Sequence, residues 1–288
     1  MKNLLFVKIT LLFFILLVAS HSYSQKLYFN VGLGYNYSAA STYSVTDNIE
    51  IYSDNGNSYV LSGVNNTLKE TISFGKGFQF GGVVGYNFSE HFSFELAVSY
   101  LNGREYEEIF TQRYANNSDA YSRIYKSQML RLMPSVKLSV GDALKPYLKT
   151  GLVIGVGSKI NVQETFNFKD QYFNAIYQLS EFDLSGGISI GFVTGIGIRI
   201  ESDDKWGFFS EINIITQSWA PEKASYSKFI QNGSDFLSRL PYNMKENVFV
   251  DSYSSSVDNS NTETSSEKLK QYFPFSSIGF NIGIYYQL

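Results

Sequence analysis

The chain has 288 residues, with 23 Lys and Arg against 26 Asp and Glu, a formal net charge of −3 and no Cys. This balance gives no basic footprint for nucleic acid, and without Cys there is neither a disulfide framework nor a thiolate metal site. Aromatic residues make up 17% of the chain and there are only 5 Pro, a composition that favours strands over helices.

The first 24 residues are expected to be an export signal that is cleaved. Lys2 precedes the apolar run Ile9–Val18, and Ser22 and Ser24 stand at the small-residue positions before a cut ahead of Gln25. A membrane-spanning helix needs about 20 apolar residues, and this run ends too early. Cleavage removes two Lys and no acidic residue, so the mature chain carries a net charge of −5.

Residues 25–288 are expected to form one domain, in which eight segments alternate apolar and polar residues. A period of two is the signature of a strand with two unlike faces. Each segment has roughly the 9 to 11 residues that a tilted strand needs to cross a bilayer. In chain order the segments are Leu27–Tyr37, Phe78–Phe88, Phe92–Asn102, Leu130–Val140, Tyr147–Ile160, Gly187–Ile200, Trp206–Thr216 and Ile278–Leu288.

The two faces of these segments differ in chemistry. In Gly187–Ile200, five isoleucines share one face and four glycines share the other. Glycines and small residues make a poor solvent coat but fit a narrow lumen, so we expect the apolar face to contact lipid. A soluble barrel around an apolar ligand is the remote alternative. The charged residues on the predicted lumen face, where they can pair across it, are Glu95, Arg131, Lys137, Lys149, Lys159, Arg199 and Glu211.

The links between the segments are alternately long and short. The long ones are Ser38–Gly77, Gly103–Gln128, Asn161–Asp183 and Gln217–Pro274, and the short ones are Ser89–His91, Gly141–Pro146 and Glu201–Lys205. This layout predicts an all-β fold, an eight-stranded antiparallel up-and-down transmembrane β-barrel with four long external loops and three short periplasmic turns. The long loops are expected to lack regular structure. Part of Asp251–Glu267, which is polar and low in complexity, is expected to be disordered.

Aromatic residues fall into two groups. Those at strand ends suit the girdles at the two membrane interfaces, and they are Phe88, Phe92, Tyr100, Trp206, Phe208, Phe275 and Tyr286. Those in the long links either form a binding surface for an extracellular glycan or protein, or pack on themselves, and they are Tyr43, Tyr52, Tyr59, Tyr106, Tyr114, Tyr121, Tyr172, Phe173 and Tyr177.

The sequence offers no catalytic constellation. Hydrolases among outer-membrane barrels need an activated Ser or water beside a His near the external rim. The only His of the mature chain, His91, lies in a short link at the opposite end. The glycine runs match no phosphate-loop spacing, and the acidic link that contains Glu201, Asp203 and Asp204 is expected to be a solvated turn rather than a cation site. We therefore expect no enzyme activity, cofactor or metal.

Two stretches resemble a known family. Gly81–Tyr100, GGVVGYNFSEHFSFELAVSY, resembles the hairpin of small OmpA-like barrels, and the whole mature pattern is similar to the outer-membrane β-barrel proteins of Bacteroidetes. The end of the chain, SSIGFNIGIYYQL, resembles the closing strand that the barrel-insertion machinery reads, except that Leu288 stands where Phe is usual. The resemblance implies a fold and a place in the bacterial outer membrane, among its lipids and lipopolysaccharide. It does not imply an activity.

These observations predict a non-enzymatic barrel that anchors surface-exposed loops for envelope structure, adhesion or partner binding. The alternative is a small solute channel with a charged lumen, in which Glu95 and Glu211 face Arg131, Lys137 and Arg199 and gate a narrow water path. Eight strands leave a bore that side chains just fill, which favours a plug over a gate.

Overall fold

The computed structural model describes residues 27–39, 51–54, 57–60, 72–114, 117–169, 174–201, 205–252 and 262–288. The predicted signal, residues 1–24, lies outside this part of the chain, as does most of the stretch that we expected to be disordered. No helix in the described residues is long and apolar enough to cross a membrane.

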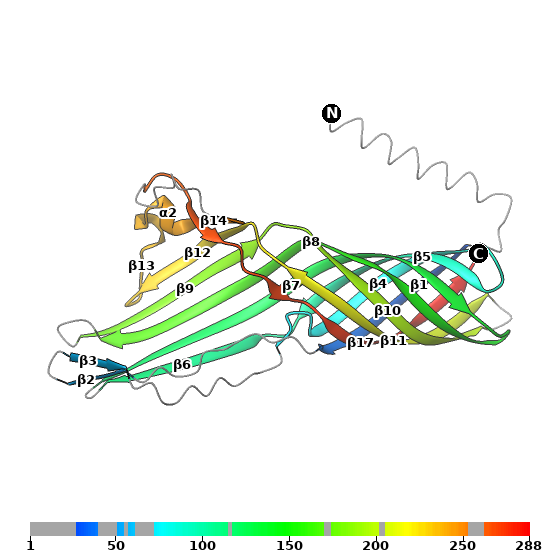
Figure 1. The fold of residues 1–288 in the computed structure, drawn as a ribbon, viewed down its shortest axis with the longest axis horizontal. Coiled ribbons are helices and arrows are strands. Elements are labelled where there is room, and N and C mark those ends of the chain that lie inside the picture. Colours follow the sequence, from blue (N-terminus) through cyan, green and yellow to red (C-terminus); the bar gives the residue numbers. More distant parts are fainter. Residues whose placement is uncertain are drawn as a thin grey trace.

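Eight antiparallel strands close into a barrel (Figure 1), which confirms the predicted fold class. They are β1 (Leu27–Ser38), β4 (Gly77–Asn87), β5 (Phe92–Gly103), β7 (Asn117–Ser139), β8 (Leu144–Lys169), β10 (Ser189–Glu201), β11 (Trp206–Trp219) and β17 (Ser277–Gln287). In space they follow the order β8-β10-β11-β17-β1-β4-β5-β7, and pairing of β7 with β8 closes the ring. Each of the eight alternating segments lies on one of these strands.

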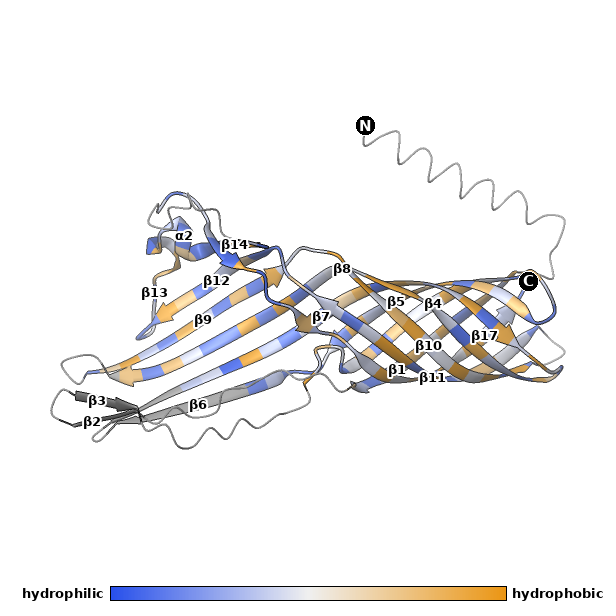
Figure 2. Cartoon of the chain, viewed as in Figure 1, coloured by the Kyte–Doolittle hydropathy of each residue, from blue (hydrophilic) through white to orange (hydrophobic). Residues whose placement is uncertain are grey.

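The barrel exposes its apolar face. Ile188, Ile190 and Phe192 are 65–71% exposed, and Figure 2 shows hydrophobic residues along the outside of the barrel strands. The lumen face carries glycines, serines and the buried charges. Tyr28 of β1 pairs with Gln287 of β17, so the first and last strands meet at the end that carries the short links.

All four long links contain regular strands, which corrects our expectation of structureless loops. Strands of the last three links extend the barrel sheet. The added strands are β6 (Tyr106–Tyr114), β9 (Ala175–Ser185), β12 (Lys223–Gln231), β14 (Glu246–Val250) and β15 (Ser266–Leu269). With the extended ends of β7 and β8 they form a sheet of order β6-β7-β8-β9-β12-β14-β15, which we call the blade. The blade projects from the long-link end of the barrel (Figure 1).

The smaller elements lie in the first and last long links. The first link contains the hairpin of β2 (Ile51–Asp54) and β3 (Asn57–Val60). The last link contains β13 (Ser234–Asp235), a 3-10 turn η2 (Leu237–Arg239), the short helix α2 (Tyr242–Lys245) and β16 (Phe273–Pro274).

The blade is hydrogen-bonded continuously to the barrel. Gly155 of β8 pairs with Ser189 of β10, and four residues later Lys159 pairs with Ser185 of β9. The strands β9 and β10 therefore keep one register against β8, with a short break between them. In the same way β11 pairs with β10 and β12 pairs with β9. Ladders of this kind connect the two parts more firmly than a flexible linker would.

A bulge in β8 marks the boundary between barrel and blade. Gly157 has φ of 59°, and the register between β7 and β8 shifts by one residue between Gln128 and Leu130. Before the bulge, buried residues such as Val153 stand at odd positions. After it, Ile160 and Val162 are buried at even positions. An extra residue moves every later side chain to the opposite face of a strand.

Candidate functional site

The lumen contains a buried ion pair near the short-link end. Lys137 Nζ on β7 lies 2.5 Å from Glu95 Oε1 on β5. Tyr28 on β1 donates from its hydroxyl to the same carboxylate oxygen at 2.7 Å. Both charged side chains are at most 4% exposed, so each charge is stabilised by its partner rather than by bulk water.

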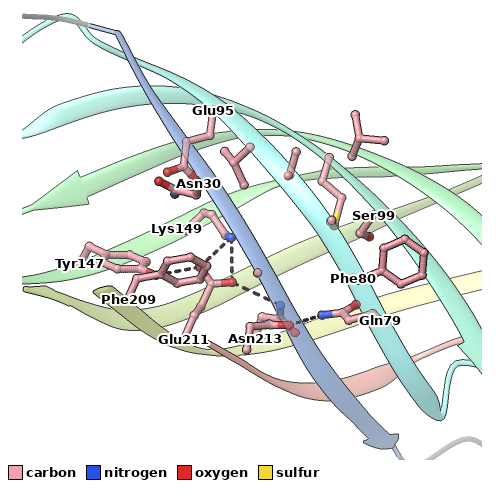
Figure 3. Close-up of a pocket in the computed structure, with 18 residues that line it drawn as sticks. Asn30, Gln79, Phe80, Glu95, Ser99, Tyr147, Lys149, Phe209, Glu211 and Asn213 are labelled. Carbon is pink, nitrogen blue, oxygen red and sulfur yellow. Dashed lines mark hydrogen bonds and ion pairs between the residues drawn. The ribbon is translucent and has the colours of Figure 1, made fainter. Parts of the chain in front are cut away.

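A second cluster lies across the lumen, centred on Glu211 of β11. Lys149 Nζ lies 2.7 Å from Glu211, and the Tyr147 hydroxyl donates to the same carboxylate at 3.1 Å. Figure 3 shows these side chains converging from β8 and β11, the two strands that flank β10, with Asn213 adding an amide donor at 3.3 Å. The two clusters consist of two carboxylates, two ammonium groups and two phenols, which fill this level of the barrel.

Glycines make room for the two phenol rings. A Cβ at Gly85 would collide with the ring of Tyr28, and one at Gly197 would collide with Tyr147. The lumen glycines that the sequence placed on one face therefore have a specific use here, because only a strand without a side chain lets a large ring cross the narrow bore.

Arg199 covers this level at the short-link mouth. Its guanidinium lies 2.6 Å from Glu201 and 4.2 Å from the centre of the Tyr285 ring. Lys145 also contacts Glu201, at 2.6 Å. The mouth is therefore occupied by an ion-pair network and an aromatic ring.

On the long-link side of the charged clusters there is a cavity of about 70 Å³, lined by Glu95, Lys149 and Glu211 of those clusters together with amide, small and aromatic side chains. Gln79 donates to Asn281 and accepts from Asn36, whose Nδ2 lies 3.0 Å away. A buried water needs about 10–15 Å³ of such space, so the cavity has room for a few waters.

Arg131 lies above this cavity and is fully buried. Its Nε donates to Gln217 at 3.0 Å and its Nη2 donates to the carbonyl oxygen of Phe275 at 3.1 Å. Among the described residues no carboxylate pairs with it. Its contact with the Phe275 carbonyl ties the lumen to the segment that closes the long-link end.

A hydrophobic core, which we call the cap, closes the barrel at the foot of the blade. Trp219 and Phe275 are both 0% exposed, their ring centres lie 6.0 Å apart, and the Trp219 indole donates to the carbonyl of Gly186 at 2.9 Å. The buried members of the cap are Ile72, Phe74, Leu101, Tyr125, Met129, Ile160, Val162, Leu184, Trp219, Ala224, Phe273 and Phe275. Segments that precede β4 and β17 thus fold into the opening of the barrel at the long-link end.

Six of the seven predicted lumen charges lie in the barrel interior or at its mouth, and Lys159 does not. It lies above the Gly157 bulge, on the outer face of the blade, where it pairs with Asp183 at 2.8 Å and is 42% exposed. The sequence pattern placed Lys159 on the lumen face because the odd positions before it point inward. The bulge reverses that relation.

The predicted interface aromatics also divide. Phe88, Phe92, Trp206 and Phe208 are exposed on the barrel surface, Tyr286 packs against Trp206 there, and Tyr100 packs on Phe80 nearer the long-link end. Phe275 is different, because it belongs to the cap. It precedes β17, where the chain turns into the opening at the long-link end instead of running along the lipid-facing surface.

The structure places the other residues that the sequence analysis singled out as follows. His91 lies in the β4–β5 turn, with Nδ1 3.2 Å from the carbonyl of Ser139. The described residues contain no group of three or more His, Asp and Glu that could hold a metal ion. Of the three acidic residues in the link Glu201–Lys205, only Glu201 lies within the described residues. Of the loop aromatics with described side chains, Tyr106 packs against the cap, Tyr121 packs on Phe166 and Tyr177 is exposed.

Sequence reasoning missed the cap, the blade and the phenols of Tyr28, Tyr147 and Tyr285. The phenols had a usable signal, because each lies on the small and polar face of its own alternating segment. The blade had one too, since the period of two continues past Ile160 through Val162 to Phe166.

Comparison with known proteins supports the barrel architecture. Residues 22–213 match the model of a family described as outer membrane protein beta-barrel domain. None of the curated proteins matches the chain. The chain is similar to the crystal structure of Acinetobacter baumannii CarO, with 12% identity over 73% of this chain and 92% of that one, and a TM-score of 0.27.

A second similar structure is that of Acinetobacter baumannii CarO2, with 11% identity over 90% of this chain and 98% of that one, and a TM-score of 0.29. Both TM-scores are too low to carry an argument. The family match is different, because it spans well over half of the chain and begins before β1 and ends within β11. The chain therefore belongs to the outer membrane protein β-barrel domain family.

Proposed function

We propose that this protein is a non-enzymatic surface protein, whose closed barrel in the outer membrane holds the blade on the cell exterior for binding another molecule. The observation that carries the proposal is the closure of the lumen at three levels, by Arg199 with Glu201, by the Glu95 and Glu211 clusters, and by the cap. Because a closed barrel passes no solute, the exposed blade is the part that remains to carry the function.

The signal is cleaved before Gln25, the insertion machinery reads β17, and the exposed apolar band contacts outer-membrane lipid and lipopolysaccharide. The hairpin and closing strand support kinship with small OmpA-like barrels of Bacteroidetes. A conducting lumen is the second candidate, and the charges at its centre are what favours it.

The wild-type protein is expected to give no ion current in a planar bilayer at neutral pH. A general porin, reconstituted at the same density, provides the positive control. Glu95→Gln, which removes one lumen charge, is also expected to leave the current at zero because the other levels stay closed. Stepwise currents from the wild-type protein that Glu95→Gln alters would replace our proposal with the channel.

Trypsin added to intact cells is expected to cut the blade and to spare the short links. Lys268 is exposed on the blade and Arg239 is exposed in η2, in the same long link, whereas Lys205 is exposed at the opposite end of the barrel. Mass spectrometry should therefore find cleavage after the first two residues in intact cells, and after Lys205 only once the outer membrane has been permeabilised. Early cleavage at Lys205 would mean that the protein faces the other way.

A further inference from the structure

The far edge of the blade contains a pocket that is separate from the lumen. The strands β12 and β14, with α2 beside them, lie together at this edge (Figure 1). The pocket has a volume of about 390 Å³, within the range of small-molecule sites, which is roughly 300–1,000 Å³. Its floor is the face of the blade that carries Tyr226 and Asn247, and residues before β14 and on β15 form its walls.

The apolar part of the pocket is made of rings and flexible side chains. Tyr226 and Phe229 of β12 supply two rings, and Tyr226 is fixed by packing against Phe182, 5.0 Å away between ring centres. Leu240 and Met244, from the segment that contains α2, also line the pocket. Flat rings beside aliphatic side chains suit a ligand with one flat apolar face.

The polar part offers hydrogen-bond donors that the protein does not use. Asn247 is buried, and its Oδ1 accepts from Ser266 Oγ at 2.6 Å, which leaves its Nδ2 directed elsewhere. Within the described part of the chain, neither Asn247 Nδ2 nor the Tyr226 hydroxyl has a hydrogen-bond partner. Burial, with the Glu164 carboxylate second, raises the pKa of Tyr226, so its phenol keeps a proton to donate.

One charge lines the pocket. Lys268 of β15 is exposed, and among the described residues no carboxylate pairs with it, in contrast to Lys270, which lies 3.0 Å from Asp251. An ammonium group beside donor groups and rings favours an anionic ligand with hydroxyl groups.

We propose that this pocket binds a carboxylate-bearing sugar, a uronic acid residue of an extracellular polysaccharide. The sugar packs its C–H face on the rings of Tyr226 and Phe229, its hydroxyls accept from Asn247 and Tyr226, and its carboxylate pairs with Lys268. This inference rests on the proposed function, because it gives the displayed blade a ligand class.

Methionine methyl NMR provides a test in the folded protein. The mature chain has three Met, and only Met244 lines the pocket, while Met129 belongs to the cap and Met133 faces the lumen. In protein labelled with ¹³C-methyl methionine, in detergent micelles, glucuronate is expected to shift the Met244 signal and leave the other two in place. Glucose is expected to bind roughly tenfold more weakly, as expected for the loss of one charge-assisted hydrogen bond.

Three variants assign the contacts. Lys268→Gln should weaken glucuronate about tenfold, to the level of glucose, and leave glucose unchanged. Tyr226→Phe should weaken both sugars, since both use its hydroxyl. The matched control is Lys223→Gln, which removes the same charge from the opposite face of β12 and should change neither.

Several outcomes would overturn the assignment. If the Met244 signal does not respond to glucuronate, or if Lys268→Gln binds it as well as the wild type does, the pocket does not bind a uronic acid. If inorganic phosphate competes as strongly as glucuronate, the site is a plain anion site. Bilayer current is measured on the same preparation, so a failed sugar site is distinguished from a failed closed-barrel proposal.

Discussion

Replacing Lys137 with Met is expected to lower the free energy of unfolding by about 3–5 kcal/mol. The substitution leaves the Glu95 carboxylate, which is only 4% exposed, in the lumen without its ammonium partner. Urea unfolding in detergent micelles, followed by the fluorescence of Trp206 and Trp219, provides the measurement.

The chain offers a matched control for Lys137→Met on the same strand. Lys126→Met breaks the pair of Lys126 with Glu105, whose side chains are 48% and 63% exposed, and such a surface pair contributes at most about 1 kcal/mol. The double variant Glu95→Gln/Lys137→Met should recover part of the lost stability, because neither position then carries a buried charge without its partner. Equal losses for Lys137→Met and Lys126→Met would contradict the account of the lumen.

Replacing Trp219 with Ala is expected to have an effect of similar size, about 3–5 kcal/mol, for a different reason. Trp219 is the largest fully buried side chain of the described residues, and its loss leaves a hole between Phe273 and Phe275. The cap lies where the blade meets the barrel. We therefore also expect Trp219→Ala to accelerate amide hydrogen exchange more in β9 and β12 than in the barrel strands.

Trp206→Ala is the control for this second prediction. Trp206 lies on the outer surface of the barrel and packs mainly on Tyr286, so its removal should reduce stability less and leave exchange in the blade unchanged. If Trp219→Ala speeds exchange in β1 and β17 as much as in β9 and β12, the cap supports the whole barrel instead of the blade.

The barrel was predictable from the sequence because each membrane strand needs one apolar and one small or polar face. Because of that requirement, eight segments show a period of two in hydrophobicity. The alternation of short and long links between them then predicts the up-and-down order. The pairing of Glu95 with Lys137, rather than with another lumen cation, was not predictable. It depends on the stagger between β5 and β7, which alternation within one strand does not specify.

The blade and the cap were missed for another reason. Long links usually form loops, so the pattern that includes Val162 and Phe182 was assigned to a loop instead of to strands. Lys159 and Phe275 were misplaced because each lies where the chain departs from a regular strand, at the Gly157 bulge and in the turn before β17. A departure of one residue leaves almost no trace in composition.

The bulge at Gly157 also explains how one strand can belong to both the barrel and the blade. Along β8 the even positions stay mostly apolar from Leu148 to Phe166, yet they point outward before the bulge and inward after it. The same greasy stripe thus meets hydrocarbon first and the protein's own interior later. A single inserted residue thus marks where the lipid-facing surface of β8 ends, and so sets how deeply the barrel is inserted in its membrane.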